Sequence, residues 1–154
     1  MSERRVTEVF FYHLERATLE EVLPTLLERS LERGWRAVVQ AASEERVEAL
    51  DTLLWTYREE SFLAHGTARD GPAAAQPIYL TAGPGNPNEA QIRFLVDGAD
   101  LEDAAPYARV VFVFDGRDAE AVSRARAQWQ EAKAQGLSVS YWQQDSDGRW
   151  QQKA

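Results

Sequence analysis

The run Val110-Val111-Phe112-Val113-Phe114 decides the fold, because five consecutive apolar residues leave no polar face for solvent. A strand of this kind, which here extends over residues 107–115, is typical of the centre of a sheet covered on both faces. Shortly after it, Asp118 begins a helical segment that ends just before Gly136. A buried strand followed by a helix predicts a crossover unit of a parallel sheet.

The N-terminal part of the chain alternates strand and helix in the same way. Residues 7–14 mix aromatic and β-branched types, which favours a strand. Thr18, with Glu21 three positions later, forms the pattern of a capping box that begins a helix, and Gly34 is a suitable end for it. Pro24 interrupts this pattern, because a proline inside a helix removes a hydrogen bond. The helix therefore either kinks at Pro24 or begins later than the capping box indicates.

Further strands follow along the chain. Residues 35–41 predict a buried strand, after which Ser43 is placed to cap a second helix. Residues 77–81 and 91–97 predict two short strands, and the Gly- and Pro-rich segment between them favours a hairpin. Residues 138–143 predict a final strand before a tight turn and a polar tail.

The size and pattern of the chain suit one folding unit. With 154 residues, 44% of them hydrophobic, it is long enough to bury about two-thirds of the surface that its unfolded form exposes. Strands that alternate with helices indicate an α/β fold. We predict a single three-layer domain over residues 1–154, with a mainly parallel central sheet and helices on both faces, Rossmann-like but without a nucleotide site.

Composition limits the class of protein further. The chain has no cysteine, which excludes a disulfide framework and thiolate metal sites. Its charged first residues and short apolar runs match neither a signal segment nor a membrane span. We therefore expect a cytoplasmic protein without a membrane partner.

The net charge bears on nucleic-acid binding. The formal charge is −8, whereas phosphate binding draws on clustered Lys and Arg side chains. We therefore expect any contact with DNA to be indirect, through a partner protein, and a lobe that binds single strands by itself is disfavoured. A local basic pocket is not excluded, because screening at physiological salt confines surface fields to about 8 Å.

The sequence shows neither a nucleotide site nor a catalytic site. The segment Gly83-Pro84-Gly85-Asn86-Pro87 lacks the Lys-Ser/Thr of a phosphate-binding loop, and its prolines remove backbone donors. His13 and His65 have no second His or Cys at metal-ligand spacing. Ser61 has His65 nearby but no carboxylate that would organise the two as a nucleophile site.

We predict that the protein is not an enzyme and has no metal or other cofactor. The alternative is a small α/β nucleotide-binding enzyme with an unrecognised site.

Several blocks of the sequence together resemble one known family. Residues 50–65 combine Leu54-Trp55-Thr56 at a helix end with Glu60-Ser61-Phe62 in the loop after it. Further blocks follow the family order: Glu8-Val9-Phe10-Phe11-Tyr12-His13-Leu14, then Gln76-Pro77-Ile78-Tyr79-Leu80-Thr81 with Asn86 and Phe94-Leu95-Val96-Asp97-Gly98-Ala99, and then residues 136–144. Over nearly its whole length the chain is similar to the chi subunit of bacterial DNA polymerase III. The family commonly has Pro where this chain has Ala64, a difference that concerns the local loop shape.

The resemblance implies a function. Chi is a small α/β accessory subunit, without a known catalytic site of its own, that links the clamp loader to the single-stranded DNA-binding protein during DNA replication. It captures the acidic C-terminal tail of that protein, which ends in Pro-Phe. By alignment with the family, the tail-peptide site here consists of Phe62, Arg126, Trp129 and Lys133.

Spacing alone allows two interpretations of Trp129. Arg126, Trp129 and Lys133 form one stripe on the predicted helix, with the aromatic residue between two cations. With Val122 and two alanines, Trp129 also forms an apolar stripe, so its ring either faces the sheet or walls a peptide slot. Both interpretations are correct if Trp129 lies at the border of the core. The best-known family members have another cation in place of Val122, which implies weaker tail binding here.

The resemblance implies a second contact surface at the end of the helix that Ser43 begins. The family places there the contact with psi, the small partner that bridges chi to the clamp loader. The matching residues are Leu54, Trp55 and Tyr57. Leu54 and Tyr57 fall on one helical face and Trp55 lies beside it. Such an aromatic residue either contacts a partner, psi or the clamp loader itself, or belongs to the core.

Overall fold

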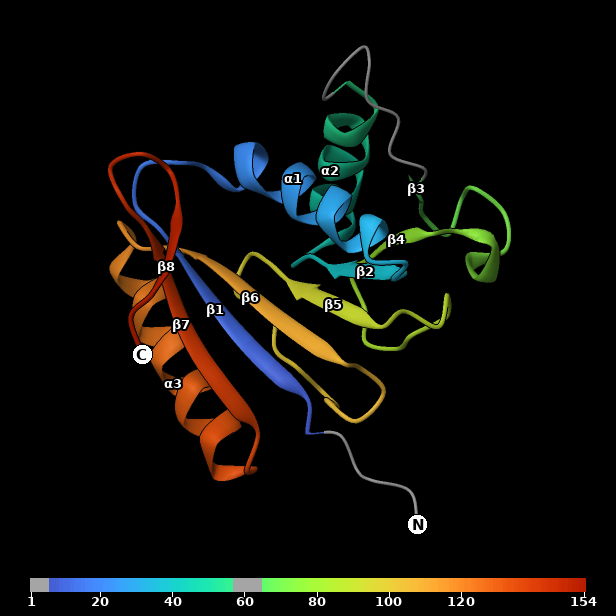
Figure 1. Ribbon diagram of the computed structural model, residues 1–154. Coiled ribbons are helices and arrows are strands. Elements are labelled where there is room, and N and C mark those ends of the chain that lie inside the picture. The colour runs from blue at the N-terminus through green and yellow to red at the C-terminus, as the bar shows by residue number, and fades with distance from the viewer. Residues whose placement is uncertain (1–5, 57–64) are drawn as a thin grey trace.

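The computed structural model describes residues 6–56 and 65–154. Figure 1 shows its helices and strands, arranged around one sheet. The strands are β1 (Glu8–Leu14), β2 (Ala37–Gln40), β3 (His65–Gly66), β4 (Ile78–Thr81), β5 (Ile92–Leu95), β6 (Arg109–Asp115), β7 (Ser138–Gln144) and β8 (Trp150–Gln152). The helices are α1 (Leu19–Glu32), α2 (Glu44–Thr56), α3 (Ala119–Ala134) and the short 3₁₀ helix η1 (Ala73–Ala75).

The strands follow the order β3-β4-β2-β5-β6-β1-β7-β8. Every neighbouring pair is parallel except β7 and β8, so the predicted α/β fold with a mainly parallel sheet is confirmed. β6 lies between β5 and β1, and all five residues of the run from Val110 to Phe114 are buried. The apolar run therefore has a strand on each side and no face in solvent.

The predicted hairpin of residues 77–81 and 91–97 is wrong. β4 and β5 both run parallel to β2 and lie on either side of it. The connection between them includes Asn88, which is buried and whose amide donates hydrogen bonds to the carbonyls of Ala37 (2.9 Å) and Gln76 (3.0 Å). The turn-forming residues predicted a reversal of the chain, but they did not show that the apolar strand β2 takes both neighbouring positions.

The predicted capping residues begin the helices. The backbone N–H of Glu21 donates to Thr18 Oγ1 (3.3 Å), so α1 begins directly after Thr18 and includes Pro24. This excludes the alternative of a later start. Ser43 and Asp118 accept hydrogen bonds from backbone N–H groups in the first turns of α2 and α3.

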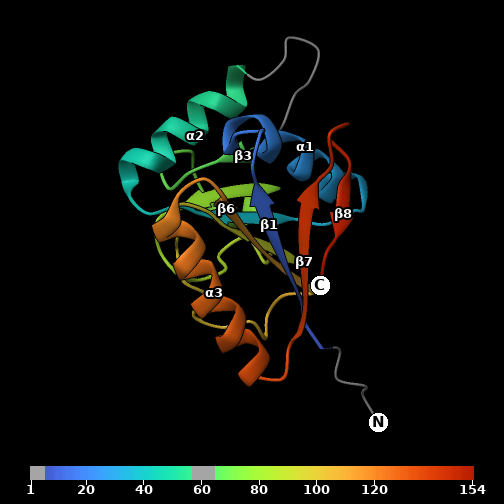
Figure 2. The same ribbon diagram turned by 90° about the vertical axis from the view of Figure 1, so that its left-hand side faces the viewer.

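Helices cover both faces of the sheet, as predicted: α1 and α2 lie on one face and α3 on the other (Figure 2). Each face has its own apolar core, the larger one beneath α1 and α2. Strand β1 leads into α1, whereas its neighbour β6 leads into α3 on the opposite face. The carboxyl ends of β1 and β6 thus form a topological switch point. None of the described helices is long and apolar enough to cross a membrane.

Candidate functional site

The side chains predicted on α3 form one continuous surface. The half-buried ring of Trp129 packs edge-on against Phe11 of β1, with 5.4 Å between centroids, and against Tyr141 of β7, with 6.2 Å. Lys133 Nζ lies 5.4 Å from the centre of the same ring. Trp129 therefore lies at the border of the core, where it fills the interior and also contributes to the surface. Its role as the wall of a peptide slot stays a prediction.

Arg126 lies on α3 three positions before Trp129, on the same stripe of the helix. Burial raises the pKa of the Tyr141 phenol, whereas a hydrogen bond with Gln143 and the charge of Arg126 oppose that rise. Arg126 and Lys133 are exposed, and no ion pair joins either of them to another described residue. They lie seven positions apart in the sequence, about 10.5 Å along a helix axis, with Trp129 between. Both cations are therefore available to an external anion.

Two residues without a predicted binding role, His13 and Tyr141, belong to the same surface. The Tyr141 hydroxyl contacts His13 Nδ1, because the parallel pairing of β7 with β1 brings them together. Burial lowers the pKa of His13, although Glu15, whose carboxylate lies 3.4 Å from Nε2, and Asp115 both oppose this shift. His13 and Tyr141 lie 128 residues apart, so only the strand order reveals their contact. Each falls inside a block that carries the family resemblance, which was the one available signal.

The end of α2 presents one large aromatic side chain. Trp55 is 54% exposed, whereas its neighbour Leu54 is only 2% exposed and packs in the core. The Trp55 ring lies 4.5 Å from that of His65, whose side chain is fully buried. His65 Nε2 is 3.0 Å from Asp51 Oδ1 and 3.2 Å from the Asp51 carbonyl, and only the carbonyl has hydrogen-bond geometry. Thus Trp55 rests on a buried histidine, and Leu54 supports the helix from inside.

Two residues of the predicted sites, Tyr57 and Phe62, lie outside the described residues. The described residues on either side of them, Thr56 and His65, belong to α2 and to the edge strand β3. Trp129, in contrast, packs on β7, which lies near the opposite edge of the sheet. The structure therefore brings together the three predicted tail-site residues of α3, and the place of Phe62 in that site stays a prediction.

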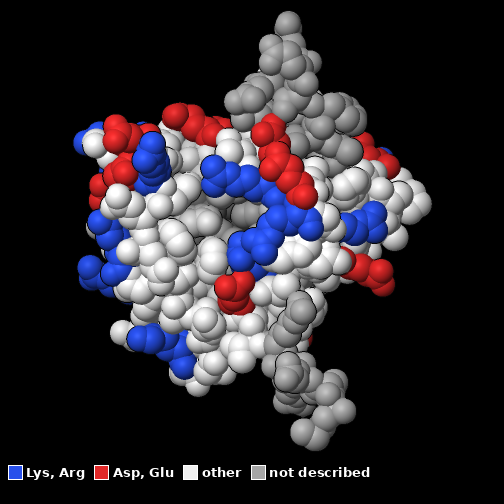
Figure 3. Space-filling model, in the orientation of Figure 1, with Lys and Arg blue, Asp and Glu red and all other residues white. Residues whose placement is uncertain are grey.

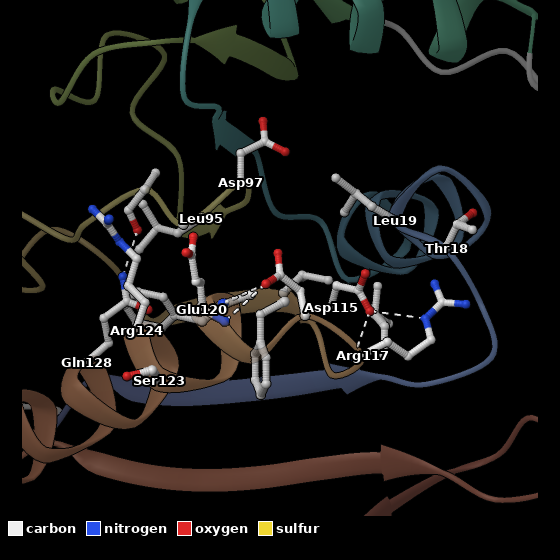
Figure 4. A pocket seen from close by; sticks show the side chains of 18 of the residues that line it. Thr18, Leu19, Leu95, Asp97, Asp115, Arg117, Glu120, Ser123, Arg124 and Gln128 are labelled. Atoms are coloured by element: carbon white, nitrogen blue, oxygen red, sulfur yellow. Dashed lines mark hydrogen bonds and ion pairs between the residues drawn. The ribbon is translucent and has the colours of Figure 1, made fainter.

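A cavity of about 790 Å³ lies at the switch point, between the starts of α1 and α3 (Figure 4). Its lining has three arginines and five carboxylates. Arg46 binds Asp97 through two hydrogen bonds of 3.1 and 3.2 Å, and Arg117 binds Asp115 at 3.2 Å. Nucleotides bind at this place in many α/β sheets, but the acidic excess here opposes phosphate. Among the described residues, no three His, Cys, Asp or Glu side chains are grouped so that they could hold a metal ion.

Comparison with known proteins points to one family. The family model described as the DNA polymerase III chi subunit, HolC, matches residues 6–140. A protein of Rickettsia prowazekii (strain Madrid E), described as a probable DNA polymerase III subunit chi, is 27% identical over 103 residues. The aligned part makes up 67% of this chain and 62% of that relative, so the chain spans less than two-thirds of its length. The family match includes the α3 surface residues Arg126, Trp129 and Lys133 and also Trp55.

Proposed function

From the fact that this chain belongs to the family of DNA polymerase III chi subunits, we propose that it is a non-catalytic bridge between the clamp loader and the single-stranded DNA-binding protein. Membership of the family makes it an accessory subunit of DNA polymerase III that acts in DNA replication. The bridging role, its two partners and a cytoplasmic location are the proposed part. We also infer that residues 1–154 form one chi-like domain, since every described strand joins the same sheet.

The α3 surface is the proposed binding site for the acidic tail that ends in Pro-Phe. An acidic tail requires cations for its carboxylates, and its last residue requires an apolar surface for the phenyl ring. Arg126 and Lys133 supply cations that no ion pair joins to another described residue, and Trp129, in contact with Tyr141, supplies aromatic surface. The two cations lie about 10.5 Å apart along the helix, a distance that about three extended peptide residues cover. A terminal carboxylate and an upstream acidic residue can thus be bound together.

The observation that carries this proposal is the position of Trp129. An indole buried entirely against the sheet offers nothing to a peptide, whereas Trp129 is half-buried and has Lys133 beside its ring. Its other contacts, with Phe11 and Tyr141, hold the ring in place. The surface is therefore ordered before a peptide arrives, which lowers the entropic cost of binding.

The exposed Trp55 is the proposed anchor for the second partner, psi or the clamp loader itself. Large aromatic residues that are exposed in the free protein often become the centre of an interface. The fully buried His65 lies beneath Trp55 and limits its freedom. Helix α2, which carries Trp55, and helix α3 lie on opposite faces of the sheet (Figure 2), so this arrangement allows both partners to bind at once.

Calorimetric titration with the tail peptide of the cognate single-stranded DNA-binding protein tests the proposal. We expect one peptide to bind each chain, with an affinity that falls as salt rises, because charge contacts contribute. Removal of the terminal Phe from the peptide should abolish most of the binding. Absence of binding at low salt would refute the proposal. Thermal stabilisation by ATP, GTP or NAD at low concentration would support the alternative of a nucleotide-binding enzyme.

A further inference from the structure

Arginine side chains ring a hollow beneath the C-terminal end of α1, at the centre of the face shown in Figure 3. The hollow is a cavity of about 400 Å³. Arg29 comes from the last turn of α1, Arg33 is its C-terminal cap residue, and Arg109 comes from β6. The lining has three guanidinium groups and a single carboxylate, that of Glu32. This is a local basic pocket in a chain whose net charge is −8.

Aromatic rings hold two of these arginines in place. The guanidinium carbon of Arg33 lies 4.1 Å from the centre of the Trp35 ring, and that of Arg109 lies 4.2 Å from the centre of Phe10. Arg109 also binds Glu8 at 3.0 Å, but no ion pair joins Arg29 or Arg33 to any residue of the described ranges. A guanidinium stacked on a ring keeps the donors at its edge free for an oxyanion.

A row of half-buried aromatic side chains lies beside the pocket, on the same face of the sheet. Strand alternation turns Phe10 and Tyr12 of β1 and Trp142 of β7 towards this face, and Trp150 of β8 adjoins them. Their ring centroids are 5.5 Å apart for Phe10 and Trp142 and 4.4 Å apart for Tyr12 and Trp150. Figure 3 shows a largely uncharged surface there, next to the hollow.

The helices of this face leave that row only partly covered, since Phe10, Tyr12, Trp142 and Trp150 are all half-buried. α1 packs against β2 and β6, and α2 packs against β3 and β4. β1, β7 and β8 extend beyond them on the same face (Figure 1). The pocket and the row therefore form one surface, in which cations at one end adjoin aromatic rings at the other.

We propose that this surface binds a short stretch of single-stranded nucleic acid directly, with phosphates at Arg29, Arg33 and Arg109 and bases against Tyr12, Trp142 and Trp150. Proteins bind single strands without sequence preference by combining a basic groove with aromatic side chains on which bases stack. The chain's negative charge does not prevent this, because at physiological salt only charges within about 8 Å act strongly. The contact is weak, with a dissociation constant on the order of 10⁻⁵ M, in the range of non-specific binding.

The aromatic row favours nucleic acid over an acidic peptide as the occupant. An acidic peptide needs the arginines for its carboxylates and a single apolar slot for one side chain, so it has no use for a row of several rings. A strand of nucleotides instead repeats a phosphate and a planar base along its length, which matches a basic pocket continued by several rings. The tail-peptide site on α3 lies on the other face of the sheet, so the two sites are tested separately.

Fluorescence anisotropy with a labelled oligo-dT of about ten nucleotides, without any partner protein, tests the proposal. We expect binding at about 50 mM salt that weakens steeply as salt rises. The double variant Arg29→Glu, Arg33→Glu should lose binding by tenfold or more, because it places two carboxylates where phosphates bind. Trp150→Ala, which leaves the pocket intact, should weaken binding severalfold and more for oligo-dT than for inorganic phosphate.

The matched control is the double variant Arg117→Glu, Arg124→Glu, which changes the net charge equally at exposed arginines outside the pocket and the row. It should keep the affinity of the unaltered protein. Absence of oligonucleotide binding at low salt would overturn the proposal, as would equal losses in both double variants. If an acidic peptide binds and is released by Arg29→Glu, Arg33→Glu while the oligonucleotide does not bind, the pocket is a peptide site and the nucleic-acid assignment is wrong.

Discussion

Lys133 and Trp129 form a cation–π pair on α3, with 5.4 Å between Nζ and the centre of the ring. They lie one helical turn apart, so the helix itself brings them together. A pair of this kind contributes about 0.5 to 1 kcal/mol at an exposed site, enough to favour one position of the flexible lysine. The ammonium group is thus kept beside the aromatic surface on which a peptide is proposed to bind.

Removal of either cation of the α3 surface should weaken binding of the acidic tail. Arg126→Ala and Lys133→Ala should each cost about 1 to 3 kcal/mol of binding free energy, because each deletes a charge-assisted contact. Calorimetric titration at constant ionic strength measures the loss. Arg124→Ala is the control on the same helix, since Arg124 binds Asp100 (3.0 Å) away from this surface. Unchanged affinity in both Arg126 and Lys133 variants, with the fold intact, would place the site elsewhere.

Trp55→Ala should separate the two partner surfaces. It should weaken recruitment to the clamp-loader complex by about 2 kcal/mol or more, because an interface anchor is lost, and leave tail binding unchanged. Since Trp55 is 54% exposed, thermal stability should fall little. The neighbouring Leu54→Ala is the contrast, because truncation of a buried leucine should cost about 2 to 5 kcal/mol of unfolding free energy. A comparable loss of stability in Trp55→Ala would make the residue structural.

Phe62 is expected to act in tail binding through its shape, as the family resemblance implies. Phe62→Leu should keep part of the affinity, whereas Phe62→Asp should lose nearly all of it, because its carboxylate would repel the acidic peptide. Titration of both variants with the tail peptide measures the two affinities. If Phe62→Asp binds the tail normally but no longer joins the clamp-loader complex, Phe62 belongs with Trp55 and not with α3.

His13 should make the stability of the fold depend on pH. Burial lowers the pKa of His13 in the folded protein, so the unfolded chain takes up a proton first as pH falls below about 6.5. The free energy of unfolding should therefore decrease between that pH and the lowered pKa of the folded state, and change no further from this group below it. Urea denaturation at several pH values should show a smaller decrease in this window for His13→Gln. An equal decrease in both proteins would assign the effect to other groups.

Local signals predicted the elements of this fold well because caps and apolar runs act over a few residues. Thr18 and Asp118 begin helices, and the apolar run of residues 110–114 lies in the interior strand β6, as expected. The predicted hairpin failed, because turn residues do not determine which strand lies next to which. The same limit applies to sites: spacing predicted that Arg126 and Lys133 lie on one stripe of a helix, whereas their role in tail binding was implied only by the family resemblance.

The sequence did not predict the contacts that depend on the order of the strands in the sheet. The pairing of β1 with β7 joins His13 to Tyr141 across 128 residues. The arginine pocket likewise combines Arg29 and Arg33 with Arg109 of β6. In each case the sequence around these residues has no pattern that indicates a site. They share a surface only because the assembled sheet brings them together.

Chemical-shift mapping with the cognate tail peptide tests the central claim most directly. Backbone amides are followed while the peptide is added to the full chain. The α3 site predicts that the largest changes occur at residues 126–133 and at Tyr141 of β7, with saturation at one peptide per chain. Changes confined to residues 83–88, with α3 and β7 unmoved, would contradict it.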